Sequence, residues 1–324
     1  MKPVQRKTIM MSILLSGVMD HTIYAHDHED TTDQIDNSPR RQYNLKPSEF
    51  SENHAWAMGN SKKLGAPHLA TYLPTKWDFS NQIVHIHSQG SLGSCSAQAL
   101  TLSMELSLQK NNIQTTLSPL YVYYNERVFE NSVNLDSGAT LSDGVRAICT
   151  WGACKETTWS YDNYMTKFKI KPSDAAYAEG RTLLYLGAIV PNHVDYSLTS
   201  IKYILSQNIP IIFGVFIYPS FESGDVIRTG KVPMPSRYEQ PLGGHALTFV
   251  GYNDETQEFK FANSWGKDWG DNGCGYISYQ YVMNEGASGI RPYFFANDLW
   301  SISSRPISLN NTEDEAEDGP ESKE

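Results

Sequence analysis

Cysteine, positive charge and long apolar runs are all scarce in this sequence. Only 4 of the 324 residues are cysteine, too few for a scaffold built on disulfides, so a hydrophobic core must hold the fold. Lys and Arg number 26 against 36 Asp and Glu, and the net charge of −10 argues against nucleic-acid or anionic-membrane partners. No apolar run approaches the ~20 residues of a transmembrane helix. What remains is a globular chain, long enough for one large core or two smaller ones.

The two ends of the chain differ in composition from its middle. Three basic residues precede an apolar stretch at residues 9–19, and Ala25 offers a cleavage position before a charged run. This layout is typical of a secretory signal, so we expect residues 1–25 to be a signal peptide and the protein to be secreted or periplasmic. Residues 305–324 form an acidic tail that we expect to be disordered, because it has little apolar surface to bury.

Between these ends the chain divides into two parts. Residues 26–71 are polar with scattered aromatic residues, and they read as a pro-segment or accessory segment that needs another surface to pack on. Residues 72–304 have the apolar density of a folded domain. Within this domain, apolar residues at three- to four-residue spacing predict helices over 96–111, 141–152 and 197–207. Short runs rich in β-branched and aromatic residues predict strands over 210–218, 245–254, 258–266 and 274–282. Helices first and strands later indicate an α+β fold of two packed halves with a cleft between them.

Cys95 lies in the stretch "SQGSLGSCSAQAL", at the expected start of a helix. The positive end of a helix dipole favours the thiolate and lowers the pKa of a cysteine from its free value of about 8.5. Because the thiolate is the reactive form, Cys95 is a candidate nucleophile. It needs a base or imidazolium from elsewhere in the chain.

His245 and Asn263 have the settings that such a partner requires. His245 follows two glycines and opens a buried strand, which would fix its ring, whereas His85 and His87 are better explained as satisfied core or surface residues. Asn263 comes just after another strand and can orient the imidazole, with Trp265 shielding the Asn-to-His hydrogen bond from water.

Gln89 completes the candidate site. Six residues before the cysteine, its side-chain amide can donate to an oxyanion beside the backbone amide of Cys95. Each of the four residues would be structural more often than not if it stood alone. Together, in this order and with these flanking glycines, they favour acyl transfer.

These stretches resemble the papain-like cysteine peptidases. "QGSLGSC" resembles the segment with the oxyanion glutamine and the nucleophile, "GGHALTFVGY" the histidine strand, and "ANSWGKDWGDNGCGYIS" the asparagine segment. The likeness covers roughly residues 72–304 and is closer to bacterial members, which "LSPLYVYYNER", "GATLSDGVRAI" and "WGACKETTWSY" also resemble. Asn263 lies somewhat further from Cys95 than the ~130–150 residues usual in the family, as an inserted loop over 220–241 would produce.

The resemblance implies a helical left domain carrying Cys95 and a β-barrel-like right domain carrying His245 and Asn263, with the substrate between them. It also implies that Gly138 meets the substrate backbone, because a side chain there would keep an extended peptide from docking edge-on. Gly244 and Trp265 are assigned to substrate binding with it.

Two departures from the family pattern are visible. Leu92 replaces a cysteine that many members place three residues before the nucleophile, and Ser96 replaces the usual aromatic residue after it. Neither change removes a catalytic group. Cys149, Cys154 and Cys274 can pair in more than one way or remain buried thiols, and they lack the close pairing of zinc ligands, so we expect neither metal nor cofactor.

The function expected from these observations is hydrolysis of peptide bonds by a secreted cysteine peptidase. Peptides or proteins are the expected partners, and the segment 26–71 is expected to restrain the enzyme if it behaves as the pro-region of a zymogen. Two alternatives remain open. One is a binding module that uses the cleft without catalysis, and the other is an acyl transferase that passes the same thioester to an amine.

Overall fold

The computed structural model describes residues 41–48, 52–67, 72–161, 166–185, 190–283 and 298–303. All of these residues fall in one compact unit, Pro39–Glu324. The expected signal peptide and acidic tail lie outside the described residues. In the described part of the chain, no helix has the length and apolar character needed to cross a membrane.

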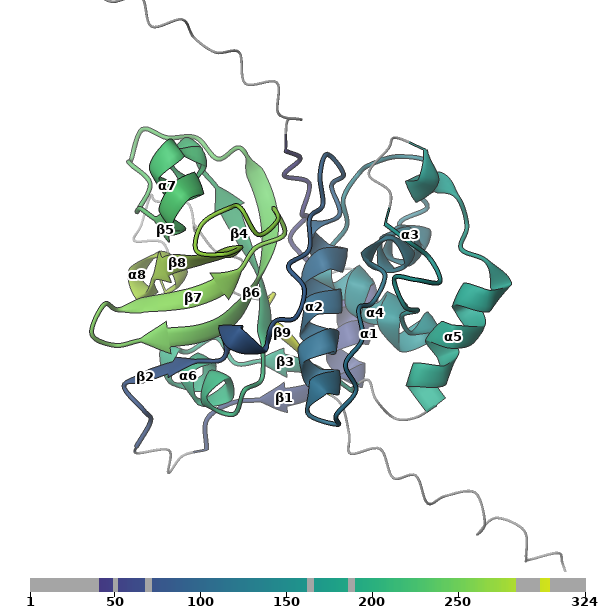
Figure 1. Cartoon of the computed structure of the whole chain (residues 1–324), viewed down its shortest axis with the longest axis horizontal. Helices are drawn as coiled ribbons and strands as arrows, with labels where there is room; N and C mark the ends of the chain where they lie inside the picture. The colour runs from purple at the N-terminus through teal and green to yellow at the C-terminus, as the bar shows by residue number, and fades with distance from the viewer. Residues whose placement is uncertain are drawn as a thin grey trace, which may run out of the picture. The chain divides into compact units, whose positions relative to one another are not determined.

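The helical lobe is built mainly by helices from the first half of the chain (Figure 1). Its core contains apolar side chains from α2 (Cys95–Gln109), α3 (Pro119–Phe129) and α4 (Leu141–Trp151), with α5 (Asp174–Tyr185) against α4. Side chains cap two of these helices, because Ser118 accepts the N–H of Tyr121 and Thr140 accepts that of Asp143. The short helix η2 (Lys167–Lys169) contacts α3.

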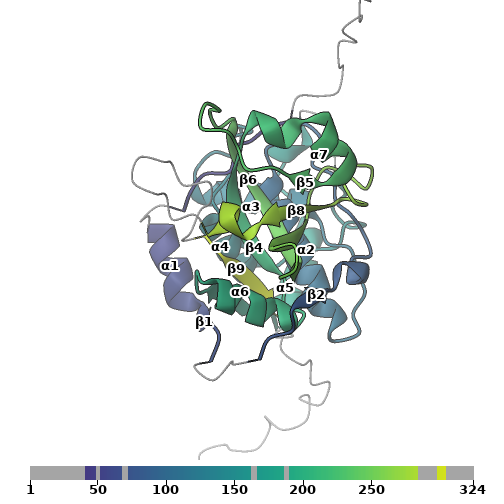
Figure 2. The same cartoon turned by 90° about the vertical axis from the view of Figure 1, so that its left-hand side faces the viewer.

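The sheet lobe follows in the second half of the chain. Among the described residues its strands run in the order β1-β3-β9-β4-β6-β7-β8-β5, and β2 pairs with β6. The bounds are β1 Lys62–Leu64, β2 Lys76–Asp78, β3 Val190–Val194, β4 Ile211–Ile217, β5 Lys231–Val232, β6 Gly243–Asn253, β7 Glu258–Ala262, β8 Cys274–Ser278 and β9 Trp300–Ser303. Figure 2 shows α6 (Leu198–Ser206) and α7 (Gly224–Thr229) at opposite ends of this lobe. Two short 3₁₀ helices, η1 (Ser80–Gln82) and η3 (Pro219–Glu222), complete it.

The expected α+β, two-lobed fold is confirmed. Most predicted elements are present, with corrections at the ends of two strands. The strand expected over 258–266 ends at Ala262, where its pairing with β8 stops. The run expected to be a strand over 274–282 ends at Ser278, and Tyr279–Val282 form the short helix α8. The cause is local, because the Ser278 hydroxyl accepts the N–H of Tyr281 at 3.1 Å and so caps a helix start.

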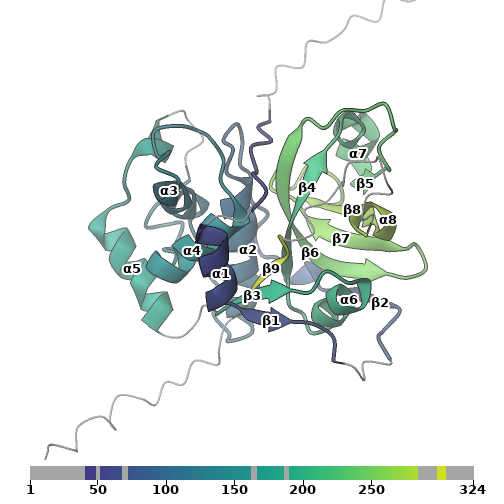
Figure 3. The ribbon, with the colours of Figure 1, turned by 180° about the vertical axis from the view of Figure 1, so that it is seen from behind.

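The described residues before 72, which are 41–48 and 52–67, are part of this fold. Glu52–Asn60 form helix α1, which packs on α4, and β1 pairs with β3 in parallel. Residues 41–48 run between the two lobes, as the purple start of the described chain shows from both sides (Figures 1 and 3). The helical lobe and β3 therefore provide the packing surface that we expected this segment to need.

Candidate active site

Cys95 is the first residue of α2 and is fully buried. The loop before it is fixed by Tyr161, whose hydroxyl donates to the Gln89 carbonyl at 2.8 Å and lies 2.7 Å from the Ser94 hydroxyl. Gly90 in this loop has a φ of +58°, a left-handed conformation that glycine adopts readily. The glycine-rich run therefore forms a tight turn that delivers the thiol to the helix start.

His245 comes from the other lobe, on β6. Its Nε2 lies 2.9 Å from Oδ1 of Asn263, and its ring stacks on Trp265 with 5.0 Å between the ring centroids. Since an amide oxygen only accepts, Nε2 carries the proton in this assignment, and Nδ1 is left as the free acceptor. Nδ1 has no hydrogen-bond partner among the residues that the structure describes.

The two lobes meet at the cysteine. The Cys95 sulfur accepts a hydrogen bond from the backbone N–H of Ala246, the residue directly after His245. Further along the same contact, the Thr248 hydroxyl lies 3.4 Å from the Ala99 carbonyl, so α2 lies along β6. Thiol and imidazole are therefore contributed by opposite lobes, at the point where helix and strand touch.

Gln89 lies in the same buried junction. Its Nε2 donates to the Leu92 carbonyl at 2.9 Å, and its Oε1 accepts the Ser264 hydroxyl at 2.7 Å. Its backbone N–H also donates to the Ser264 carbonyl at 2.9 Å. These contacts fix the amide plane, with one N–H used by Leu92 and the second available for another acceptor.

The junction is covered by the chain's own residues 41–46, which we call the covering segment. The Leu45 N–H donates to the Gly244 carbonyl at 3.0 Å, and the Lys46 N–H donates to the Ala139 carbonyl at 3.2 Å. A side chain at Gly138 would place its Cβ 2.0 Å from the Asn44 carbonyl oxygen. The two glycines that sequence assigned to substrate binding thus contact an extended backbone that belongs to this chain.

Aromatic and cationic side chains of the covering segment lie over the imidazole. The Tyr43 ring meets His245 edge-on at 6.1 Å, and the Arg41 guanidinium lies 4.3 Å from the Trp265 ring centroid. Trp265 therefore contacts both the His245 imidazole and the Arg41 guanidinium.

Burial decides the charges of the covered site. It is the main reason that the pKa of His245 falls to about 4; the hydrogen bond that His245 donates to Asn263 opposes this fall, and the nearby Arg41 charge contributes to it. Burial also raises the pKa of the Cys95 thiol to about 12, although the Ala246 N–H favours the thiolate. At neutral pH the covered site therefore contains a thiol and a neutral imidazole.

Ser96, which stands where related sequences place an aromatic residue, has a polar partner. Its hydroxyl donates to Oε1 of Glu126 at 2.7 Å, and Oε2 of this fully buried carboxyl has no partner among the described residues. Gly144 leaves room for the Glu126 carboxyl, because a Cβ at residue 144 would lie 2.9 Å from Oε2. Burial raises the pKa of Glu126 well above its ordinary value.

Glu126→Gln should therefore make the protein more stable at alkaline pH. A carboxyl with a raised folded-state pKa contributes stability that is complete below its unfolded pKa of about 4.3 and is lost as pH rises through the folded value. The amide keeps the acceptor for Ser96 and cannot ionise. Urea unfolding at several pH values should show a flatter profile for this variant, while the exposed control Glu255→Gln keeps the parental slope. Equal slopes in all three proteins would contradict the assignment.

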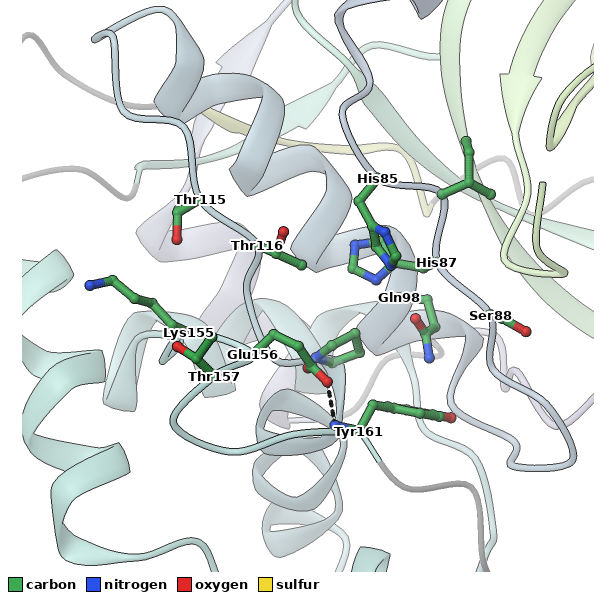
Figure 4. Close-up of a pocket in the computed structure, with 12 residues that line it drawn as sticks. His85, His87, Ser88, Gln98, Thr115, Thr116, Lys155, Glu156, Thr157 and Tyr161 are labelled. Atoms are coloured by element: carbon green, nitrogen blue, oxygen red, sulfur yellow. Dashed lines mark hydrogen bonds between the residues drawn. The ribbon is translucent and has the colours of Figure 1, made fainter.

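The remaining candidates of the sequence have structural surroundings. His87 is buried and pairs with Glu105 at 3.1 Å, as expected for a satisfied core histidine. All four cysteines are free thiols, and the described residues hold no group of three or more ligands suited to a metal. A cavity of about 580 Å³ opens between His85, Gln98, Lys155 and Tyr161 (Figure 4), and none of the four candidate catalytic residues lines it.

Sequence reasoning missed Tyr161, Glu126 and the covering segment. Tyr161 and Glu126 act through long-range hydrogen bonds, which no local pattern reveals. The covering segment did have a signal, because "RQYNLK" is a basic and aromatic run in an acidic protein. Such a run is suited to an acidic, aromatic-lined surface.

Fold and site together define a two-lobed cysteine peptidase. Comparison with known families agrees, because the model of the papain family cysteine proteases matches residues 73–294. The chain belongs to the papain family. An uncharacterized peptidase C1-like protein of Acanthamoeba polyphaga mimivirus is 38% identical over 221 residues, which are 66% of this chain and 68% of the viral protein.

Solved structures show the same fold. Xylellain, a cysteine protease from Xylella fastidiosa, superposes with a TM-score of 0.71 at 26% identity, covering 84% of this chain and 99% of xylellain. Digestive procathepsin L2 from the midgut of Tenebrio molitor larvae superposes with a TM-score of 0.57 at 16% identity, covering 81% and 78% of the two chains. The expected likeness to bacterial members is confirmed by xylellain.

Proposed function

We propose that the protein is a secreted cysteine peptidase in which Cys95, His245, Asn263 and Gln89 hydrolyse peptide bonds. The observation that carries the proposal is the hydrogen bond between Asn263, directly after β7, and His245 on β6, beside the helix start that bears Cys95. The ring nitrogen left without a partner is the one available to take a proton from the thiol.

The reaction follows from these positions. His245 takes the proton of Cys95, and the thiolate attacks the carbonyl carbon of the substrate. The Gln89 amide and the Cys95 N–H donate to the oxyanion that forms. The imidazolium then gives its proton to the leaving amine, which leaves a thioester on Cys95. Water, deprotonated by His245, hydrolyses the thioester, and Asn263 keeps the ring aligned throughout.

Gln89→Ala should lower kcat/KM by about 10²–10³-fold, the usual loss for one oxyanion donor. Because Gln89 also accepts a hydrogen bond from Ser264, a purely structural loss needs a control. Ser264→Ala removes the same bond but keeps the amide, so it should lose much less activity. Steady-state kinetics on one peptide substrate would test this, and equal losses in the two variants would count against an oxyanion role.

We also propose that the covering segment keeps the enzyme latent. It supplies an extended backbone that hydrogen-bonds to Gly244 and Ala139, where a substrate backbone would dock. It also excludes water from the imidazole and places the Arg41 charge near it, which disfavours the thiolate–imidazolium pair. Release of the segment would admit both water and substrate.

The proposal that the protein is exported rests only on the sequence of residues 1–25. We propose that residues 1–25 direct secretion and are removed. Fractionation of expressing cells with N-terminal sequencing of the mature chain would test this. A start at His26 outside the cytoplasm is the expected result, whereas an intact Met1 in the cytoplasm would end the proposal.

Hydrolysis is favoured over the two alternatives for specific reasons. A binding module without catalysis would not need Asn263 to hold Nε2 of His245 so that Nδ1 is left as a free acceptor. An acyl transferase would use the same thioester, so mass analysis of the products must show water, and not an added amine, as the acceptor.

A further inference from the structure

The covering segment offers a template for the substrate, an argument that rests on the proposed peptidase function. Its backbone pairs with Gly244 on the sheet lobe and with Ala139 on the helical lobe. An extended peptide docked on the same two carbonyls would place its side chains near the positions that Arg41, Tyr43 and Lys46 occupy. What surrounds these side chains therefore indicates what the enzyme selects.

Lys46 points to an acid on the helical lobe. Its ammonium forms an ion pair with Glu130, which directly follows α3 and whose side chain is only 15% exposed. Ser132 donates a long hydrogen bond of 3.4 Å to the same carboxylate oxygen. A carboxylate so little exposed loses much of its hydration, and a cation from the bound chain compensates for that loss.

Arg41 points to an acid on the sheet lobe. Its guanidinium lies 3.8 Å from Glu222, at the end of η3, and the Tyr43 hydroxyl donates to the same carboxylate. Arg41 also lies against the Trp265 ring, which adds a cation–π contact. A second acidic position therefore lies on the sheet lobe, where it contacts Arg41 and Tyr43 of the covering segment.

Glu130 and Glu222 have the charge opposite to that of the covering segment, and this segment differs in sign from the protein as a whole. The chain carries a net charge of −10, yet the covering segment holds two cations and no acidic residue. Each of its cations meets a carboxylate from a different lobe. Ion pairs with the helical lobe and with the sheet lobe therefore favour a basic extended chain. A neutral chain in the same place would leave Glu130 without a cation.

We propose that Glu130 and Glu222 are specificity-determining residues that select peptides with Lys or Arg at the positions of Lys46 and Arg41. The substrate class is basic extended polypeptide. Glu130 has the larger effect, because it is less exposed than Glu222, whose side chain is 36% exposed.

Matched substrates test the proposal on full-length protein activated by limited proteolysis. Two peptide libraries would differ only in carrying lysine or norleucine at each varied position. The ratio of their kcat/KM values should be about fivefold in favour of lysine at one position. Glu130→Gln should bring this ratio close to one and Glu130→Lys should invert it, while Glu255→Gln keeps it. Cleavage with no preference for lysine, or a preference that survives Glu130→Gln, would overturn the inference and leave the peptidase function standing.

A second measurement does not depend on catalysis. In full-length Cys95→Ala protein, Lys46→Glu should loosen the covering segment, so that an added protease nicks it about fivefold faster. Adding Glu130→Lys should return the rate towards the parental value, because the charges are exchanged. Lys231→Glu, on an exposed lysine outside the segment, is the control and should change nothing. Additive effects of the two changes would show that the pair makes no contribution. If the exchange works while no peptide is cleaved by activated protein, the peptidase proposal alone fails.

Discussion

Cys95→Ala should abolish peptide cleavage, with a loss of about 10⁴-fold or more, while the folded protein persists. The thioester cannot form without the sulfur, so no other residue of the site substitutes for it. The removed atom is small, and the Ala246 N–H loses only a weak sulfur acceptor. The thermal unfolding midpoint should therefore change little compared with the loss of rate.

The measurement is single-turnover cleavage of a fluorogenic peptide by activated protein. Cys149→Ala is the matched control, because it removes a free thiol away from the junction and should keep full activity. Cleavage by Cys95→Ala at the parental rate would contradict the assignment of the nucleophile. Loss of cleavage in both variants would instead point to a general defect.

Release of the covering segment should raise activity by about 100-fold. A tethered occupant has an effective concentration of about a millimolar, which exceeds the KM of a good peptide substrate. Cutting the chain between the segment and α1 removes that advantage. Activity before and after limited proteolysis, with mass analysis of the product, measures the effect.

Weakening the segment without cutting it provides the control experiment. Leu45 is 5% exposed and packs in the core of the helical lobe, so Leu45→Ala should raise the activity of the uncut chain. Met58→Ala, on the exposed side of α1, should leave the uncut chain latent. An uncut chain that is as active as the cut one would show that the segment does not inhibit.

The candidate site could be predicted because its parts are encoded locally. Cys95 needs a glycine-rich turn and a helix start, and His245 needs a strand after two glycines, so each leaves a mark within about a dozen residues. The β8 end could not be predicted in this way, because "CGYISYQYV" suits a strand throughout and a single serine cap turns its last four residues into a helix.

The charges of the site could not be predicted from the sequence. A helix dipole suggested a lowered thiol pKa for Cys95, but in the covered site burial outweighs the dipole and raises it. The reason is that the solvent around Cys95 and His245 is displaced by residues far earlier in the chain. Tertiary packing decides which segment covers a site, and the spacing of residues in the sequence does not predict it.

The rate of Cys95 alkylation by iodoacetamide across pH tests the central claim most directly, because it reports the thiolate without requiring turnover. In the latent chain the rate should be negligible at neutral pH and rise only at strongly alkaline pH, as the covered thiol requires. After release of the covering segment, a plateau of fast alkylation should extend through neutral pH, with its acid limit set by ionisation of the thiol beside His245. Fast alkylation of the latent chain at neutral pH, or no gain on release, would contradict this account.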